Sequence, residues 1–329
     1  MAPARSAYGL RSVDYNEKTM RIAVIGVGGV GGYFGALLHR AGQDVTFVAR
    51  AEHLAAMRAR GLRVESVIEE PFELPVRATE TTGSLGPADL VLFAVKAYDT
   101  DAATALLPPL LGPDTAVLTL QNGVDNIDKL IDAVGTPHVL AGTAYIFSTV
   151  AAPGVIRHTG GPRRIVFGEL AGARTVRVEA IYTAFKETGI TVELSAHIMV
   201  EVWEKYIFIT AQGGMTALTR LPIGRIRSDA ETFAMYLDVA DEVAAVGRAC
   251  GVPIPDGQRE RVRRFADALE PGSYSSLYHD LTHDRRMELD ALPGTVVRLG
   301  RLHGVPTPVC RAIYAALRPY DQAARSEVG

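Results

Sequence analysis

Short apolar runs alternate with segments of helical spacing along the first third of the chain. The runs that predict buried strands lie at 21–25, 44–48, 90–95 and 116–120, and the helical segments lie at 30–41, 54–60 and 100–111. This order is typical of a parallel sheet whose strands are joined by crossover helices. A stretch rich in glycine, threonine and valine at 142–169 predicts further strands, with turns at Pro153-Gly154 and at Gly160-Gly161-Pro162.

The pattern changes near Ser195, after which apolar residues recur at helical spacing. Proline and glycine interrupt this part at 221–222, 251–255, 271–272, 293–294 and 304–308. We therefore expect an α/β domain over residues 20–194 and an all-α domain over residues 195–329. Residues 1–19 are polar and mixed in charge, which predicts a disordered leader ahead of the first strand.

Composition adds limits to this two-domain picture. A length of 329 residues agrees with about two domains, and the net charge of −3 favours neither a nucleic acid nor an anionic membrane as a partner. Cys250 and Cys310 lie far apart without metal-ligand spacing, so we expect free thiols and no metal site. The chain shows no signal peptide and no apolar run long enough to span a bilayer, so we expect a cytoplasmic protein.

A glycine-rich motif follows the first predicted strand and opens the first predicted helix. Gly26 permits a tight turn, Gly28 lets a pyrophosphate approach the backbone, and Gly31 lets the helix pack closely on the strand. The free N–H groups at the helix start would bind the phosphates. The motif predicts a Rossmann-type doubly wound sheet whose cofactor-binding residues are Gly26, Val27, Gly28, Gly29, Val30 and Gly31.

The residue at the end of the second strand indicates which dinucleotide binds. NAD enzymes usually carry an acidic residue there, which accepts hydrogen bonds from the ribose hydroxyls. This chain has Arg50, whose guanidinium suits the 2′-phosphate of NADP(H). The alternative is a solvated surface arginine, and the nearby Glu52 weakens the NADP(H) interpretation slightly.

Several further motifs occur in a fixed order along the chain. They are Lys96 after the strand at 90–95, Gln121-Asn122-Gly123 after the strand at 116–120, Trp203-Glu204-Lys205, Ser275-Ser276, Glu288-Leu289-Asp290 and the Gly-Val-Pro-Thr-Pro segment at 304–308. This ordered set resembles the ketopantoate reductase (2-dehydropantoate 2-reductase) family, from about Met20 to Leu317. The resemblance implies a Rossmann domain and a helical domain with an active site in the cleft between them. It also implies reduction of a 2-keto acid to a 2-hydroxy acid by NADPH.

The resemblance assigns a catalytic role to Lys205, which matches the family's general acid. An ammonium can stabilise and then protonate the oxygen that becomes charged when hydride reaches a keto carbon. We expect the apolar neighbours Trp203, Tyr206 and Ile207 to lower its pKa by desolvation. Glu288 matches the carboxylate that supports substrate binding and the lysine, although an exposed helical glutamate is the alternative.

Three more residues are assigned by the same resemblance. Ser276 matches the serine that binds the substrate carboxylate, with a helix N-cap as the alternative. Asn122 matches the asparagine at the nicotinamide and the substrate, with a plain Asn-Gly turn as the alternative. Lys96 contacts cofactor or substrate in this interpretation, or else lies on the surface.

The sequence departs from the family where amide side chains are typical. Ile209 and Gly213 replace asparagines one and two helical turns after Lys205, His279 replaces a glutamine, and Pro293 replaces a further asparagine. The lost amides are the groups expected to bind polar atoms of the substrate. Reduction of 2-dehydropantoate to (R)-pantoate, a step of pantothenate biosynthesis, is the first hypothesis for the activity. The alternatives are reduction of a less polar 2-keto acid and a non-catalytic NADPH-binding protein; a homodimer is left open.

Overall fold

The sheet of the first domain begins with a parallel βαβ unit, as the alternating pattern predicts. The computed structural model describes residues 19–326, so the predicted leader falls almost wholly outside the described residues. β1 (Arg21–Ile25) pairs in parallel with β2 (Asp44–Val48) on one side and β6 (Leu90–Phe93) on the other, and β6 pairs with β7 (Ala116–Thr119). Ile22 lies opposite both Val45 and Leu90 in this register. The carboxyl ends of these strands therefore meet at one edge of the sheet.

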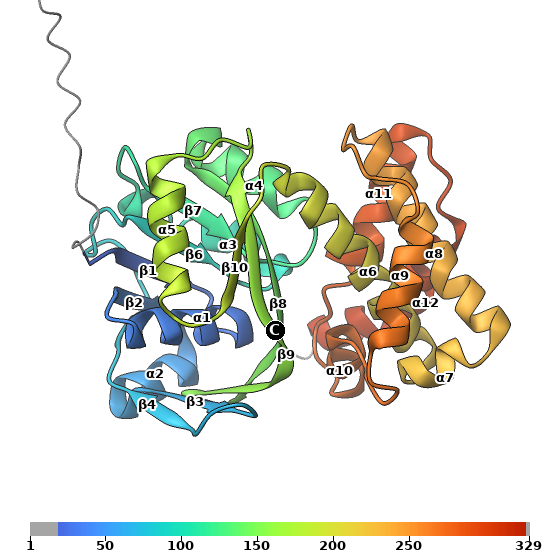
Figure 1. Cartoon of the computed structure of the whole chain (residues 1–329). Coiled ribbons are helices and arrows are strands. Elements are labelled where there is room, and N and C mark those ends of the chain that lie inside the picture. The colour runs from blue at the N-terminus through green and yellow to red at the C-terminus, as the bar shows by residue number, and fades with distance from the viewer. Residues whose placement is uncertain (1–18, 327–329) are drawn as a thin grey trace, which may run out of the picture.

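Helices cover both faces of this sheet, which makes it doubly wound (Figure 1). Alternate residues of β1 enter different cores: Ile22 and Val24 pack with residues of α1 (Gly29–Arg40), α2 (Ala51–Arg60) and α5 (Val176–Lys186). Ala23 and Ile25 pack on the opposite face with α3 (Thr100–Thr104) and α4 (Asn126–Val134). This two-residue period is what a strand buried on both faces requires.

The sheet is larger and more mixed than the sequence pattern predicts. Its order is β4-β3-β9-β8-β7-β6-β1-β2-β5, with β10 also paired to β9. The unpredicted strands are β3 (Leu62–Ser66), β4 (Phe72–Leu74), β5 (Arg77–Thr79) and β10 (Thr191–Leu194). They are short and partly exposed, so they carry no continuous apolar run that would have marked them.

The predicted strands at 142–169 form one long antiparallel hairpin. β8 (Val139–Ala152) and β9 (Val155–Glu169) are joined by the predicted turn at Pro153-Gly154, where Gly154 has a φ of 79°. The second predicted turn, Gly160-Gly161-Pro162, is wrong, because these residues lie within β9. Gly161 there has a φ of 87°, and the pairing register shifts beside Phe147. Positive φ at this point makes an irregularity in the ladder without reversing the chain.

Two helix predictions also need correction, and proline explains both. The helix expected at 100–111 ends at Thr104, and the Pro108-Pro109 pair begins the short turn η2 (Pro108–Leu110), since two consecutive prolines remove two backbone donors. The break expected at Pro293-Gly294 is absent, because η4 (Asp290–Gly294) is a π-helical turn that runs directly into α11 (Thr295–His303). The wider turn accommodates the missing N–H of Pro293. The remaining short turns are η1 (Ala97–Asp99) and η3 (Thr136–His138).

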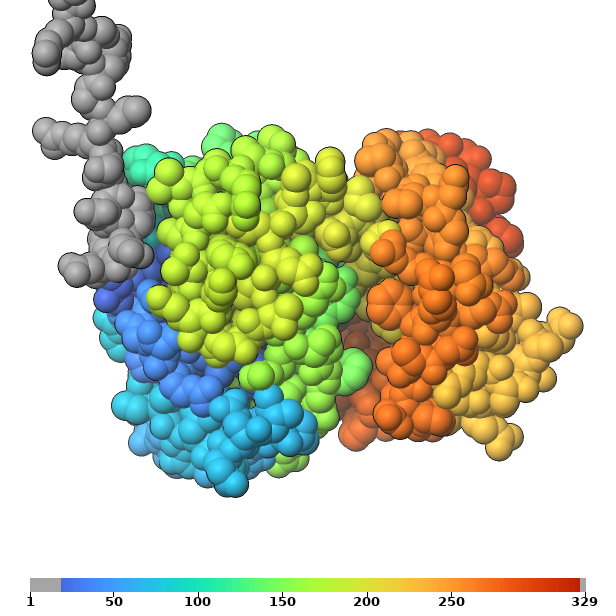
Figure 2. All heavy atoms as spheres, viewed as in Figure 1, coloured from blue at the N-terminus to red at the C-terminus, as the bar shows by residue number. Residues whose placement is uncertain are grey.

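The second half is all helical and stands beside the sheet (Figure 1). Its helices are α6 (Ile198–Thr219), α7 (Ile223–Arg227), α8 (Ala230–Ala249), α9 (Gln258–Ala268), α10 (Ser276–Thr282), α11 and α12 (Pro308–Ser326). α6 contacts β8 and β9 as well as α8, so one apolar core continues from the sheet into the helices. Figure 2 shows a recess between the two parts, where β8 and β9 face residues near α10. Within residues 19–326, no helix is long and apolar enough to cross a membrane.

Candidate active site

The glycine-rich loop joins β1 to α1 at the sheet edge where the strands end. Gly26 has a φ of 95°, and a Cβ there would lie 2.4 Å from the backbone nitrogen of Val95. A Cβ on Gly31 would lie 2.2 Å from the carbonyl oxygen of Gly26. Gly28, by contrast, faces open space and is the N-cap of α1 without a side-chain cap. Two glycines thus keep the turn tight, and the third leaves room above the helix start, which fits a dinucleotide pyrophosphate.

Arg50 lies between β2 and α2, at the position where the sequence places a ribose-binding residue. Its side chain is 74% exposed, and Nη2 donates a hydrogen bond to the Asp99 carboxylate at 2.7 Å. Asp99 ends η1, directly after β6. A guanidinium and a carboxylate, rather than the guanidinium alone, therefore occupy this part of the edge.

Lys205 and Asn122 come from different domains and meet where α6 packs against the sheet. The Lys205 Nζ donates a hydrogen bond to Asn122 Oδ1 at 2.9 Å and lies 5.7 Å from the centre of the Tyr145 ring. Burial lowers the pKa of Lys205 to about 8, although the charge of Glu288 raises it in part. The lowered value agrees with the desolvation expected from the sequence. Asn122 follows β7, and its own carbonyl accepts a hydrogen bond from Asn126.

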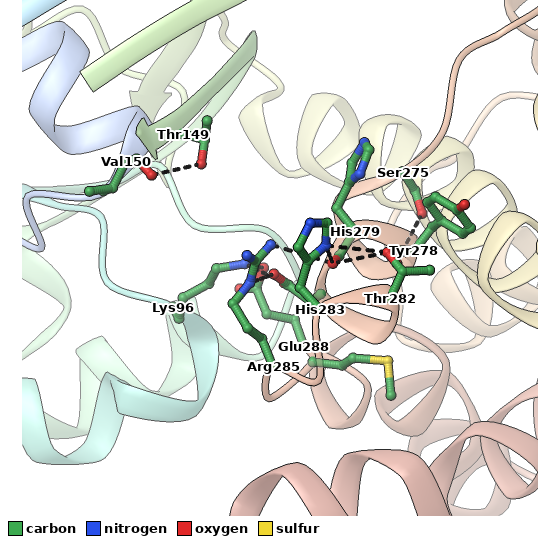
Figure 3. A network of polar contacts seen from close by, with 12 residues as sticks. Lys96, Thr149, Val150, Ser275, Tyr278, His279, Thr282, His283, Arg285 and Glu288 are labelled. Carbon is green, nitrogen blue, oxygen red and sulfur yellow. Dashed lines mark hydrogen bonds and ion pairs between the residues drawn. The ribbon is translucent and has the colours of Figure 1, made fainter. Parts of the chain in front are cut away.

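Lys96 connects the same strand edge to the helical domain through two carboxylates. Its Nζ lies 3.2 Å from Glu288 Oε2 and 3.1 Å from Asp280 Oδ2, and Figure 3 shows Lys96 reaching toward Glu288. Burial disfavours its charged form, but the charges of Glu288 and Asp280 outweigh this and raise the pKa of Lys96. The Lys96 side chain therefore stays protonated, whereas the lowered pKa of Lys205 allows that side chain to lose its proton near neutral pH.

Glu288 is 6% exposed, which excludes the alternative of an exposed helical glutamate. Besides the bond to Lys96, it accepts the backbone N–H of Ala97 at 3.0 Å. These bonds orient the carboxylate, and it acts on Lys205 through charge. Asp280 has no site role in the interpretation of the sequence. It is the second carboxylate of the pair, and it also binds Arg285 at 3.0 Å.

Ser276 is the first residue of α10 and is exposed. The cap of this helix is Ser275, whose Oγ accepts the Tyr278 N–H at 3.0 Å and the Thr216 hydroxyl at 2.7 Å. The N-cap alternative considered for Ser276 thus applies to its neighbour. The Ser276 hydroxyl is left for another partner.

The positions without the family amides are lined by apolar side chains. Gly213 is buried two turns along α6 from Lys205, and a Cβ there would meet Leu292 at 3.6 Å and Leu277 at 3.8 Å. Ile209, one turn from Lys205, is partly buried. Both leucines are buried, so this face of α6 has an apolar wall beside the lysine. The sequence marked Ile209 and Gly213, but nothing in it indicated that the two leucines adjoin Gly213.

Two residues of this region received no role from the sequence, although Gln121 belongs to one of its ordered motifs. Tyr145 faces Lys205 from β8, and Gln121 donates to the Val95 carbonyl at 3.0 Å and to the Thr100 hydroxyl at 2.8 Å. Their partners lie far away in sequence, so spacing could not reveal them. Among residues 19–326, no group of three or more metal-ligating side chains is gathered to hold an ion, and both cysteines are free.

Comparison with known families gives two matches that together cover most of the chain. Residues 22–172 match the model of "Ketopantoate reductase PanE/ApbA", and residues 197–321 match the model of its C-terminal domain. The chain is 34% identical over 320 residues to a 2-dehydropantoate 2-reductase of Mesorhizobium japonicum, covering 91% of this chain and 97% of that one. It is 31% identical to the uncharacterized oxidoreductase YkpB of Bacillus subtilis, covering 92% and 99%.

Solved structures show the same similarity in three dimensions. A PanE/ApbA family ketopantoate reductase from Ralstonia eutropha is 35% identical and superposes with a TM-score of 0.85, covering 93% of this chain and all of that one. A D-mandelate dehydrogenase bound to NADH and anilino(oxo)acetate, 22% identical, shares the fold with a TM-score of 0.85. These matches confirm the predicted Rossmann-type domain with a helical second domain. The chain belongs to the ketopantoate reductase family and is a nicotinamide-dependent oxidoreductase of 2-keto acids.

Proposed function

We propose that this protein reduces a 2-keto acid to a 2-hydroxy acid with NADPH, and that Lys205 is the proton donor. The observation that carries the proposal is the partly buried Lys205, whose Nζ is held 2.9 Å from Asn122 Oδ1 and whose pKa is lowered to about 8. An acid whose pKa lies near the working pH is both protonated and able to release its proton. A protein that only senses a dinucleotide would need no such group.

The bound cofactor would supply a hydride to the C2 carbon of the substrate. Lys205 would stabilise the negative charge that develops on the carbonyl oxygen and then transfer its Nζ proton to that oxygen. Asn122 would hold the ammonium in place through its Oδ1, and Glu288 would favour the charged form from a distance. The products would be the 2-hydroxy acid and a neutral lysine, which takes a proton from water before the next turnover.

The substrate carboxylate would be bound at the recess by Ser276. Its hydroxyl is exposed and is not used to cap α10. Lys96 is held by Glu288 and Asp280, so we assign it chiefly to fixing Glu288 and the domain contact. Gly26–Gly31 and Arg50 would bind the pyrophosphate and the adenosine ribose, respectively.

The relatives named 2-dehydropantoate 2-reductase support 2-dehydropantoate as the substrate, with (R)-pantoate as the product. One observation favours a second candidate, a 2-keto acid with a less polar side chain. Ile209 and Gly213 follow Lys205 on the same face of α6 without an amide, and Leu277 and Leu292 adjoin Gly213. A wall of this kind leaves a substrate hydroxyl without a partner, whereas an alkyl group would lose nothing there.

Consumption of NADPH by the purified full chain, followed by absorbance, tests the proposal. The panel is 2-dehydropantoate beside 2-keto acids with unsubstituted and branched alkyl chains. Fast turnover of 2-dehydropantoate supports the first candidate, and fast turnover of only the alkyl acids supports the second. Tight NADPH binding with no turnover of any of them would contradict reductase activity.

The role of Lys205 is tested by the variant Lys205→Ala. We expect kcat to fall by roughly a hundredfold to ten-thousandfold, since general acid catalysis contributes about that much. The Kd for NADPH, measured by calorimetry, should change little, because the lysine serves the keto group. Lys186→Ala, at an exposed position of α5, is the matched control. Unchanged kcat in Lys205→Ala would remove the lysine from the mechanism.

A further inference from the structure

Asp99 lies at the edge of the nucleotide site proposed above and has no role in the mechanism given there. It follows β6, while its partner Arg50 follows β2, and β1 lies between these two strands. The two residues therefore flank the end of β1, where the glycine-rich loop begins. Their ion pair of 2.7 Å joins the two sides of that loop.

The two members of this pair differ in how firmly they are held. The Arg50 side chain is 74% exposed, whereas that of Asp99 is 27% exposed. The side chains on either side of Asp99 have other partners. The Tyr98 ring centre lies 4.1 Å from the Arg286 guanidinium carbon, and the Asp101 carboxylate pairs with Lys129 at 3.1 Å. Asp99 is thus the less exposed member of the pair, and the more exposed Arg50 guanidinium extends to the Asp99 carboxylate.

No further cation supports Arg50 among the described residues at this point of the edge. Lys96 is already committed to Glu288 and Asp280. His53, on α2 beyond Arg50, has its pKa lowered by burial, so it adds no charge at neutral pH. A 2′-phosphate placed here would meet one guanidinium that already has a carboxylate partner.

We propose that Asp99 is a cofactor-selecting residue that offsets Arg50, so that the protein uses NADH as well as NADPH. A 2′-phosphate must compete with Asp99 for the Arg50 guanidinium. It must also lie close to the Asp99 carboxylate, and these two negative groups repel each other. A ribose 2′-hydroxyl instead donates a hydrogen bond to Asp99 while the pair with Arg50 stays intact. The inference rests on the nucleotide site of the proposed function and concerns its selectivity.

Calorimetric titration of the full chain with NADPH and with NADH tests this inference without any keto acid. We expect the two wild-type Kd values to differ by less than about tenfold. Asp99→Asn keeps the shape and an acceptor oxygen but removes the charge. It should tighten NADPH binding about tenfold and change NADH binding by less than about threefold. 2′,5′-ADP against ADP should show the same shift, which localises it to the 2′ position.

Asp101→Asn is the matched control, since it removes one negative charge two residues away from a side chain that is 79% exposed and paired with Lys129. Its NADPH to NADH ratio should equal that of the wild type. An unchanged ratio in Asp99→Asn, or an equal shift in Asp101→Asn, would overturn the inference. Failure of the proposed reduction would appear differently, as normal cofactor binding without turnover of any keto acid.

Discussion

At the scale of single residues, two lysines with partners across the domain boundary have opposite electrostatic surroundings. Lys205 lies among apolar groups with an amide as its hydrogen-bond partner, and burial lowers its pKa to about 8. Lys96 lies between two carboxylates, whose charges raise its pKa despite burial. Two side chains of the same type can take different chemical roles when their surroundings shift their pKa values in opposite directions. One lysine suits proton transfer, and the other suits a permanent ion pair.

The pH dependence of reduction should report the lysine that titrates. Lys205 must be protonated to donate, so kcat/KM for the keto acid should fall as the pH rises through about 8. Glu288 raises the pKa of Lys205, so Glu288→Gln should move this fall to lower pH. Steady-state rates across the neutral and alkaline range provide the check. A fall that stays in place in Glu288→Gln would show that Glu288 does not act on Lys205.

At the scale of elements, the loop between β1 and α1 contains one glycine that the packing of the fold requires and another that only ligand binding requires. A Cβ on Gly31 would meet a carbonyl oxygen at 2.2 Å, whereas a Cβ on Gly28 would meet nothing within 4 Å. Gly28 also has a φ of −82°, which any residue adopts. Gly31 is therefore required by the fold itself, whereas Gly28 is required only by the ligand that binds above it.

Alanine substitutions should separate these two requirements. Gly31→Ala should lower the free energy of unfolding by about 1–3 kcal/mol, since overpacking against backbone costs about that much. Gly28→Ala should leave the free energy of unfolding nearly unchanged and weaken cofactor binding at least several-fold, because the methyl group occupies the approach of the pyrophosphate. Denaturant melts and calorimetry measure the two quantities. Full cofactor affinity in Gly28→Ala would place the pyrophosphate elsewhere.

α6 presents Lys205, Ile209 and Gly213 at intervals of four residues, so they share one face. A Cβ at position 213 has room, because it would make ordinary contacts with Leu292 at 3.6 Å and Leu277 at 3.8 Å. Gly213→Asn should raise kcat/KM for 2-dehydropantoate relative to a branched alkyl 2-keto acid by roughly tenfold. Gly213→Ala, which adds volume without the amide, should not. Equal ratios in the two variants would show that this position does not contact the substrate hydroxyl.

At the scale of the whole molecule, polar contacts near the recess join two domains that also share an apolar core. Lys96 and Ala97 bind Glu288, and Asn122 binds Lys205, each across the boundary between sheet and helices. The core continues through α6 into the helical half. The catalytic groups are therefore supplied in pairs, one partner from each domain.

This arrangement carries a cost in stability that Lys205→Met should reveal. The pKa of Lys205 is about 8 against an ordinary 10.5, so the folded state disfavours the charged lysine below about pH 8. The penalty is up to about 3 kcal/mol there and vanishes as the pH rises toward 10.5. Lys205→Met should thus be more stable than wild type at neutral pH by up to that amount. Denaturant unfolding at neutral and alkaline pH measures it, and equal stability at neutral pH would contradict the lowered pKa.

The elements that sequence predicted well are those whose evidence is local. β1, β2, β6 and β7 begin at their predicted residues. β6 and β7 are buried along their whole length and β1 from its second residue, so their apolar runs are visible in the sequence, whereas in β2 Asp44 and Thr46 are only partly buried and Val45, Phe47 and Val48 carry the pattern. β3 and β4 lie at the far edge of the sheet, are partly exposed and lack such a run. The helix predicted at 100–111 and the break predicted at Pro293 were wrong because proline acts through the backbone context around it.

The sequence by itself determined the glycine-rich loop after β1 and the order of the two domains, because these depend on residue type and on spacing within one element. It drew attention to Lys205 only through the resemblance to the ketopantoate reductase family. Only the tertiary structure decided that Lys205 meets Asn122, that Glu288 holds Lys96, and that Asp99 faces Arg50. Each of these pairs joins elements far apart along the chain. Spacing within an element carries no information about which distant element packs against it, and the pKa of a group depends on those distant neighbours.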